Sequence, residues 1–97
     1  MARLLDKIRQ ERESIIEIAA RYQAENIRLF GSTVRGDDRQ DSDIDLLVDF
    51  LPGSTLFDQV GLIEELSGKL GRKVDVISAR ALNRHLAKDI LQEAVPL

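Results

Sequence analysis

The chain has 97 residues, of which 43% are hydrophobic and 32% charged, and its formal net charge is −3. This length suits one domain with a single modest core, and the composition is that of a globular chain rather than a disordered one. The absence of cysteine excludes disulfides, thiol catalysis and zinc sites built on cysteine. Basic and acidic residues are interspersed, so no basic stripe for direct nucleic-acid binding is visible.

The N-terminus predicts no targeting segment. Met1 to Lys7 reaches both acidic and basic residues without an uninterrupted apolar run, which argues against a secretory signal. No stretch elsewhere approaches the length of apolar sequence that a membrane span needs. We therefore expect no membrane partner and a cytoplasmic location.

The first predicted element is a helix from about Leu4 to Tyr22. Its apolar residues recur at three- and four-residue spacing, with charged residues between them. The stripe consists of Leu4, Leu5, Ile8, Ile15, Ile16, Ala19 and Tyr22. Tyr22, the only tyrosine, is expected to be a core residue.

A first strand is predicted from Glu25 to Gly31, with alternate residues on opposite faces. Ile27, Leu29 and Gly31 share one face, and Arg28 and Phe30 the other. Ser32 to Gly36 should form a short helical turn, because the Gly-Ser pair supplies a flexible bend and an N-cap. Such a turn offers backbone N–H groups and a hydroxyl to an anion.

The second strand is predicted from Asp43 to Asp49, after a polar loop. Asp43 and Asp45 are two residues apart and would point to the same face, while Ile44, Leu46 and Val48 face the core. Two neighbouring carboxylates repel each other unless a cation lies between them, and hard oxygen ligands suit Mg²⁺. An Asp-x-Asp pair is most often solvated surface. Here, however, it begins an apolar strand, where aspartate is depleted.

The rest of the chain predicts a helix, a strand and a final helix. Thr55 and Asp58 form a plausible capping box for a helix that Gly71 ends and that carries Leu56, Val60, Ile63, Leu66 and Leu70. A third strand follows at 73–77, and a last helix spans about 83–94, where Leu82, Leu86 and Ile90 share a face. The order predicts a small α/β fold with one sheet covered by helices.

Asp75 lies within the third strand, between Val74 and Val76. A carboxylate in a short apolar strand is unusual, and a neighbouring strand could place it against Asp43 and Asp45. The alternative is an edge-strand aspartate that pairs with Lys73 or Arg72. His85 lies far from these residues in the sequence and is expected to be a surface residue.

Three segments in this order resemble the DNA polymerase beta-like nucleotidyltransferase superfamily, and most closely its small MNT (minimal nucleotidyltransferase) domain proteins. The segments are Gly31-Ser32-x-x-Arg35-Gly36-Asp37, Ser42-Asp43-Ile44-Asp45-Leu46-Leu47-Val48 and Val74-Asp75-Val76-Ile77. The resemblance covers nearly the whole chain and implies one minimal nucleotidyltransferase domain over residues 1–97, with a mixed sheet covered by helices. Val34 stands where the family often has alanine, which affects no catalytic position.

The resemblance implies transfer of a nucleoside monophosphate from a nucleoside triphosphate, here ATP, with Mg²⁺ as cofactor. By position, Asp43, Asp45 and Asp75 would be the catalytic metal ligands, and Gly31 and Ser32 would hold the outer phosphates. Arg35 has two open roles, which are to steady a phosphate or to pair with Asp37.

The resemblance also implies a partner. MNT proteins of this type resemble antitoxins that pair with a HEPN-domain ribonuclease toxin, and some attach AMP units to a tyrosine of that toxin. The resulting expectation is an adenylyltransferase antitoxin in a hetero-oligomer with its HEPN-type toxin. The alternatives are a non-catalytic antitoxin that neutralises by binding, and a transferase for a small molecule or an RNA end.

Overall fold

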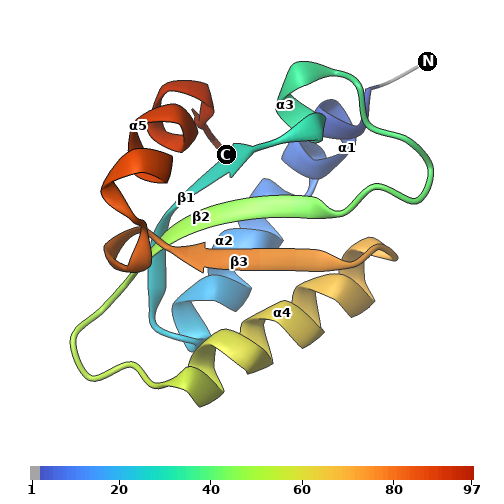
Figure 1. The fold of residues 1–97 in the computed structure, drawn as a ribbon. Helices are drawn as coiled ribbons and strands as arrows, with labels where there is room; N and C mark the ends of the chain where they lie inside the picture. Colours follow the sequence, from blue (N-terminus) through green and yellow to red (C-terminus); the bar gives the residue numbers. More distant parts are fainter. Residues whose placement is uncertain (1–2) are drawn as a thin grey trace.

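A computed structural model describes residues 3–97 of the chain. Figure 1 shows the elements in chain order, which begin with helices α1 (Leu4–Gln10) and α2 (Arg12–Arg21). The strand β1 (Ala24–Phe30), the short helix α3 (Ser32–Arg35) and the strand β2 (Ile44–Phe50) follow. The remaining elements are α4 (Leu56–Leu70), β3 (Val74–Ser78), the 3₁₀ turn η1 (Ala79–Ala81), α5 (Arg84–Glu93) and β4 (Val95–Pro96).

The four strands form one mixed sheet in the order β3-β2-β1-β4. β1 pairs antiparallel with both β2 and β4, whereas β2 and β3 are parallel. The parallel pair requires a crossover connection, which α4 supplies. The predicted α/β fold with a mixed sheet is confirmed. The sequence did not predict β4, which extends the sheet at the edge of β1.

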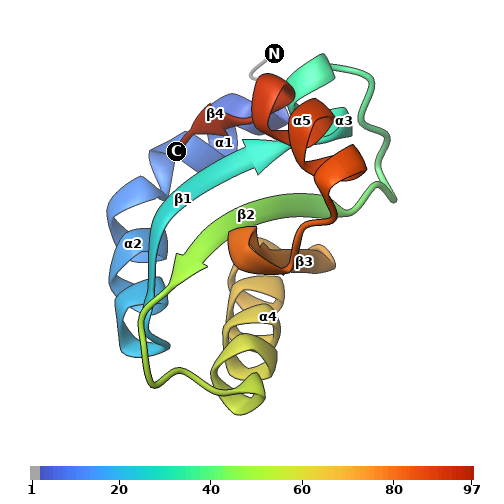
Figure 2. The same cartoon turned by 60° about the vertical axis from the view of Figure 1, so that its left-hand side comes forward.

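The helices cover the two faces of the sheet unequally. Helices α1, α2 and α4 pack on one face, and α5 lies on the other side (Figure 2). The core between the sheet and the first group of helices contains Ile8, Ile15, Ile18, Leu29, Ile44, Leu46, Val48, Leu62, Leu66, Val74 and Val76, among others. No residue of α5 is fully buried. The second face is therefore only partly covered.

The predicted first helix is two helices, which is a correction. α1 ends at Gln10 and α2 begins at Arg12, with Glu11 between them at φ −97° and ψ 14°, outside the helical range. The predicted apolar stripe nevertheless continues through both helices, since Ile8, Ile15 and Ala19 are all buried in one core. Ile18 is buried where Ile16 was expected, and Ile16 is exposed. Tyr22 is partly buried against the core, and its hydroxyl donates to Glu65 Oε1 at 2.9 Å.

Helix α4 has the predicted capping box and the predicted glycine stop. The amide of Thr55 donates to Asp58 Oδ2 at 2.9 Å, and Gly71 ends the helix at φ 67°. The predicted apolar stripe holds only in the second half of the helix. Leu66 is fully buried and Ile63 and Leu70 are partly buried, whereas Leu56 and Val60 are exposed in the first two turns. Leu62, which was not part of the predicted stripe, is also fully buried.

The last predicted helix and strand boundaries are close to the observed ones. Asn83 caps α5, and its side chain accepts a hydrogen bond from the amide of His85 at 2.9 Å. His85 is exposed, as expected for a surface residue, and so is Leu86. None of the helices within residues 3–97 is both long and apolar enough to cross a membrane.

Candidate active site

Three aspartates meet on the less covered face of the sheet. β2 and β3 are parallel, and their register places Asp45 beside Asp75. On the other side of β2, Asp45 lies opposite Phe30, the last residue of β1. Asp43 directly precedes β2 and is two residues from Asp45, so it lies on the same face. The alternation expected from the sequence is observed, because Ile44, Leu46 and Val48 are buried in the core on the opposite face.

Burial and the neighbouring carboxylates together shift the pKa of one aspartate of this group, Asp45. Burial raises the pKa of Asp45, and the negative charges of Asp75 and Asp43 raise it further, while Arg35 acts in the opposite direction. Asp43 and Asp75 are more open, with 40% and 42% of their side chains exposed. The group therefore carries surplus negative charge that a cation would neutralise.

Gly31 forms the turn between β1 and α3 beside Asp45. Its φ is +80°, a conformation that side chains disfavour. A Cβ at this position would overlap Oδ2 of Asp45. The glycine is thus required both by the backbone and by the carboxylate beside it. The amides of Ser32 and Thr33, at the start of α3, make no hydrogen bond to any residue in 3–97.

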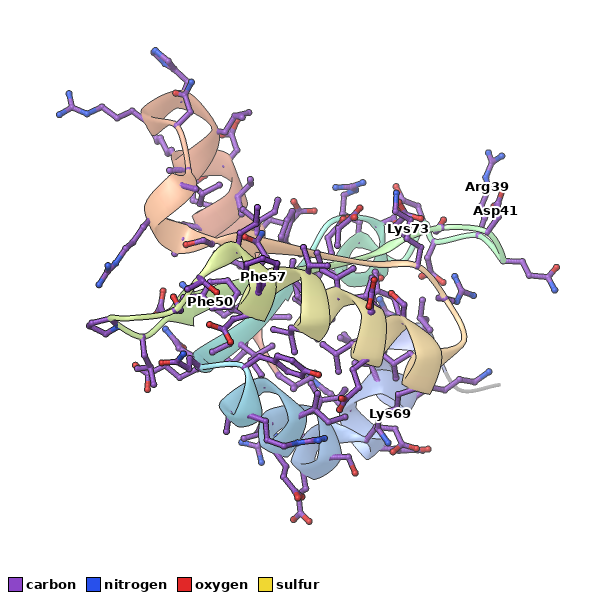
Figure 3. The ribbon with its side chains drawn as sticks, turned by 90° about the horizontal axis from the view of Figure 1, so that it is seen from below. Arg39, Asp41, Phe50, Phe57, Lys69 and Lys73 are labelled. Atoms are coloured by element: carbon purple, nitrogen blue, oxygen red, sulfur yellow. The ribbon has the colours of Figure 1, made fainter. Side chains whose placement is uncertain are left out.

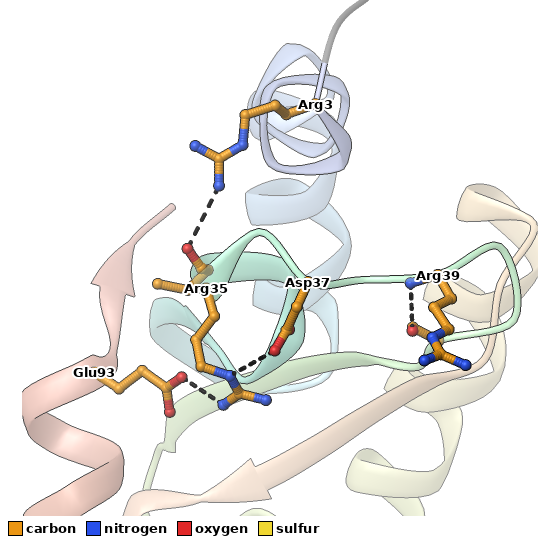
Figure 4. Close-up of polar contacts among 7 residues, drawn as sticks. Arg3, Arg35, Asp37, Arg39 and Glu93 are labelled. Carbon is orange, nitrogen blue, oxygen red and sulfur yellow. Dashed lines mark hydrogen bonds and ion pairs between the residues drawn. The ribbon is translucent and has the colours of Figure 1, made fainter.

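Arg35 is held by two carboxylates (Figure 4). Its Nε donates to Asp37 Oδ2 at 3.3 Å, and its Nη1 donates to Glu93 Oε1 at 2.7 Å. These two bonds raise the pKa of Arg35 above its ordinary value. The pairing with Asp37 was one of the two roles expected from the sequence. The pairing with Glu93 was missed, because 58 residues separate it from Arg35 along the chain.

The loop before β2 is fastened by an arginine that the sequence did not single out for this role. The Arg72 guanidinium donates to the carbonyl oxygen of Arg39 at 2.7 Å and to that of Ser42 at 3.1 Å. The Ser42 hydroxyl in turn accepts from the amide of Arg39 at 2.7 Å (Figure 4). These bonds fix the loop immediately before Asp43.

Lys73 lies between two of the aspartates. Its Nζ is 3.8 Å from Asp43 Oδ2 and 4.0 Å from Asp75 Oδ1. Of the two partners considered for Asp75, Lys73 is therefore the one beside it, whereas Arg72 contacts the loop. Asp75 also lies beside Asp45, so the ion pair and the shared carboxylate site are both present.

The donor set suits a divalent cation. Within residues 3–97, no three histidine, cysteine, aspartate or glutamate side chains form a complete metal-binding group. Mg²⁺, however, usually takes only one or two carboxylates, together with the phosphates of a substrate and water. The surplus charge around Asp45 fits such a cation, with Asp43, Asp45 and Asp75 as its candidate ligands. The missing side chain at Gly31 lets the Asp45 carboxylate lie against the turn.

The chain is similar in sequence and in fold to several known proteins. The sequence matches the family described as polymerase beta, nucleotidyltransferase over residues 13–97. The protein adenylyltransferase MntA of Thermococcus cleftensis is 38% identical over 91 residues, which cover 89% of this chain and 92% of that protein. The solved structure of a minimal nucleotidyltransferase is similar with a TM-score of 0.86 and 45% identity, and the match covers 96% of this chain and 95% of that one.

A third similarity concerns the fold alone. The structure of a tri-AMPylated HEPN toxin of Shewanella oneidensis in complex with an MNT antitoxin matches with a TM-score of 0.69. The identity is 20%, and the match covers 91% of this chain and 69% of that one.

Proposed function

The chain belongs to the polymerase beta nucleotidyltransferase family, and from this premise we propose that it transfers AMP from ATP to a hydroxyl of a partner protein. The proposed partner is a HEPN-type toxin, the acceptor is a tyrosine hydroxyl, and the transfer neutralises the toxin. The name of the Thermococcus relative and the AMP-modified toxin of the Shewanella complex support this choice of donor and partner.

The observation that carries the proposal is the register of β2 and β3. It places Asp45, which lies against the Gly31 turn, beside Asp75, and it leaves Asp43 on the same face. Carboxylates beside unpaired amides and a hydroxyl are suited to a triphosphate that is bound together with a cation. In this arrangement Gly31 and Ser32 hold the outer phosphates, and Asp43, Asp45 and Asp75 bind Mg²⁺.

The proposed reaction is an in-line displacement at the α-phosphorus of ATP. The acceptor oxygen forms a new bond to that phosphorus, the bond from the α-phosphorus to the bridging oxygen breaks, and pyrophosphate leaves. Asp75 accepts the proton of the acceptor hydroxyl. When bound, Mg²⁺ supplies positive charge to the attacking and leaving oxygens.

Arg35 has an indirect role in this proposal. Two of the N–H groups of its guanidinium, on Nε and Nη1, donate to Asp37 and Glu93. We therefore assign it to fixing the turn, where its remaining N–H groups can still donate to a phosphate.

The test combines this protein with ATP, Mg²⁺ and the product of the adjacent gene, and measures intact masses. We expect the partner to gain one or more AMP units, and we expect no gain with Asp75→Asn. A partner that is neutralised without any gain in mass would indicate inhibition by binding alone. Modification of an antibiotic or an RNA end with no protein partner present would indicate a small-molecule or RNA transferase.

A further inference from the structure

Four charged residues form a two-by-two grid on the less covered face of the sheet. Asp45 of β2 lies beside Asp75 of β3, and the amide of Ile44 donates to the carbonyl oxygen of Lys73 at 2.9 Å. Lys73 therefore stands beside Asp43, one step before the Asp45–Asp75 pair. Residues two apart in a strand share a face, so all four side chains lie on the same one. Three corners of the grid are carboxylates and the fourth is a lysine.

The lysine is the only cation of this grid and contacts two of its acids. Its Nζ lies 3.8 Å from Asp43 Oδ2 and 4.0 Å from Asp75 Oδ1, so it bridges the two strands. Figure 3 shows Lys73 near the loop that carries Arg39 and Asp41, at the opposite side of the molecule from Phe50. Its side chain is 68% exposed. Exposed ion pairs at such distances are weak and easily exchanged.

We propose that Lys73 is a tethered counter-cation of the transfer site. Before a divalent cation binds, its ammonium group holds Asp43 and Asp75 toward each other against their repulsion. The divalent cation, with twice the charge, then displaces the ammonium group from these carboxylates. Lys73 thereby holds the carboxylates in place before the cation arrives. It also lowers the affinity of the site for the cation, because the ammonium group must first be displaced. This inference rests on the proposed function, because it concerns the same metal ligands.

Two effects of opposite sign distinguish this role of Lys73 from that of an ordinary solvated lysine. Loss of the charge should destabilise the cation-free protein, because Asp43 and Asp75 then lack their partner. The same loss should strengthen cation binding, because nothing has to be displaced. A lysine with a merely structural role would change stability in one direction and leave cation affinity unaltered.

The experiment measures Mn²⁺ binding and thermal stability of the full chain without nucleotide. Lys73→Met removes the charge at similar length, and Lys73→Arg retains it. Lys7→Met is the matched control, since Lys7 is an exposed lysine of α1 with no ion pair in the part of the chain that the structure describes. Asp45→Asn identifies the Mn²⁺ ion bound at this site. Binding is followed by electron paramagnetic resonance and unfolding by circular dichroism.

We expect Lys73→Met to bind Mn²⁺ about three- to tenfold more tightly than the wild type, from the loss of two exposed ion pairs. In chelator its Tm should fall by roughly 2–6 °C, and this deficit should close at saturating Mn²⁺. Lys73→Arg should behave like the wild type, and so should Lys7→Met.

Equal or weaker Mn²⁺ binding by Lys73→Met would overturn the proposal, as would a Tm deficit that persists at saturating Mn²⁺. If Asp45→Asn abolishes binding in that case, the metal site stands and only the role of Lys73 is wrong. If the wild type binds no more Mn²⁺ than Asp45→Asn does, the proposed metal site fails and the role of Lys73 fails with it.

Discussion

The two faces of β2 contrast sharply although they belong to one strand of seven residues. On one face Ile44, Leu46 and Val48 are fully buried against α1, α2 and α4. On the other face Asp45 and its neighbour Asp43 stand in a partly covered site with surplus negative charge. The apolar face stabilises the sheet, and the acidic face holds the carboxylates of the proposed transfer site, whose mutual repulsion lowers stability. Single substitutions on each face should therefore separate stability from activity.

Asp45→Asn should have the largest effect, and mainly on activity. Removing one ligand charge should lower AMP transfer by about a thousandfold or more, which corresponds to about 4 kcal/mol of barrier. The fold should persist, because the lost charge is the one whose ionised form is disfavoured there. Intact-mass measurement of the modified partner gives the rate, and circular dichroism reports the fold. A variant with undiminished transfer would falsify the assignment of Asp45.

Leu46→Ala should produce the opposite result on the opposite face. Leu46 is 1% exposed and belongs to the main core, so truncation should destabilise the fold by roughly 2–5 kcal/mol. Below its lowered Tm, the folded fraction should retain normal transfer per molecule. Urea unfolding and transfer rates normalised to the folded fraction test this. A strongly reduced rate per folded molecule would show that the two faces are not separable.

Gly31→Val should weaken ATP binding more than Ser32→Ala does. The valine side chain would overlap Asp45 Oδ2 and would need a positive φ, whereas Ser32→Ala removes only one hydroxyl, worth about 0.5–1.5 kcal/mol. Calorimetric titration with ATP and Mg²⁺ compares the two variants. The reverse order of affinities would show that the turn is not the phosphate site.

The smallest expected effect is a pH-dependent difference in stability between Asp45→Asn and the wild type. The pKa of Asp45 is raised in the folded state, so the folded protein binds more protons than the unfolded chain between the two pKa values. Stability of the wild type relative to the variant should therefore fall as pH rises through this window. The difference should reach only about 0.5 kcal/mol, because the group is partly exposed.

Thermal unfolding in chelator from about pH 3.5 to about pH 7, a range that begins near the ordinary aspartate pKa and extends above it, would measure this difference. A wild type that becomes more stable than the variant as the pH rises would contradict the direction of the shift.

Local patterns in the sequence predicted which acidic side chains share a face of the sheet. The two-residue period of β2 and β3 determined which side chains share a face, and that period depends only on strand geometry. The Asp-x-Asp pair and Asp75 could therefore be placed together once β2 and β3 were assumed to be neighbours. Their register beside each other confirms this placement.

Long-range contacts could not be predicted in the same way. β4 has only two residues, one of them Pro96, which is too short to show a strand period. The bond from Arg35 to Glu93 joins segments 58 residues apart, and no local pattern indicates it. No glycine or proline marks the break at Glu11, so the sequence favoured one continuous helix.

The parallel register of β2 and β3 also has a consequence for folding. Asp45 and Asp75 meet only after the whole crossover through α4 has closed, so the acidic site belongs to the slow, non-local part of the folding reaction. A cation that binds only the finished site stabilises the native state by mass action. If the site completes after the rate-limiting step, the cation should slow unfolding and leave the refolding rate unchanged. The lifetime of the native state would then depend on the cation concentration, whereas the folding rate would not.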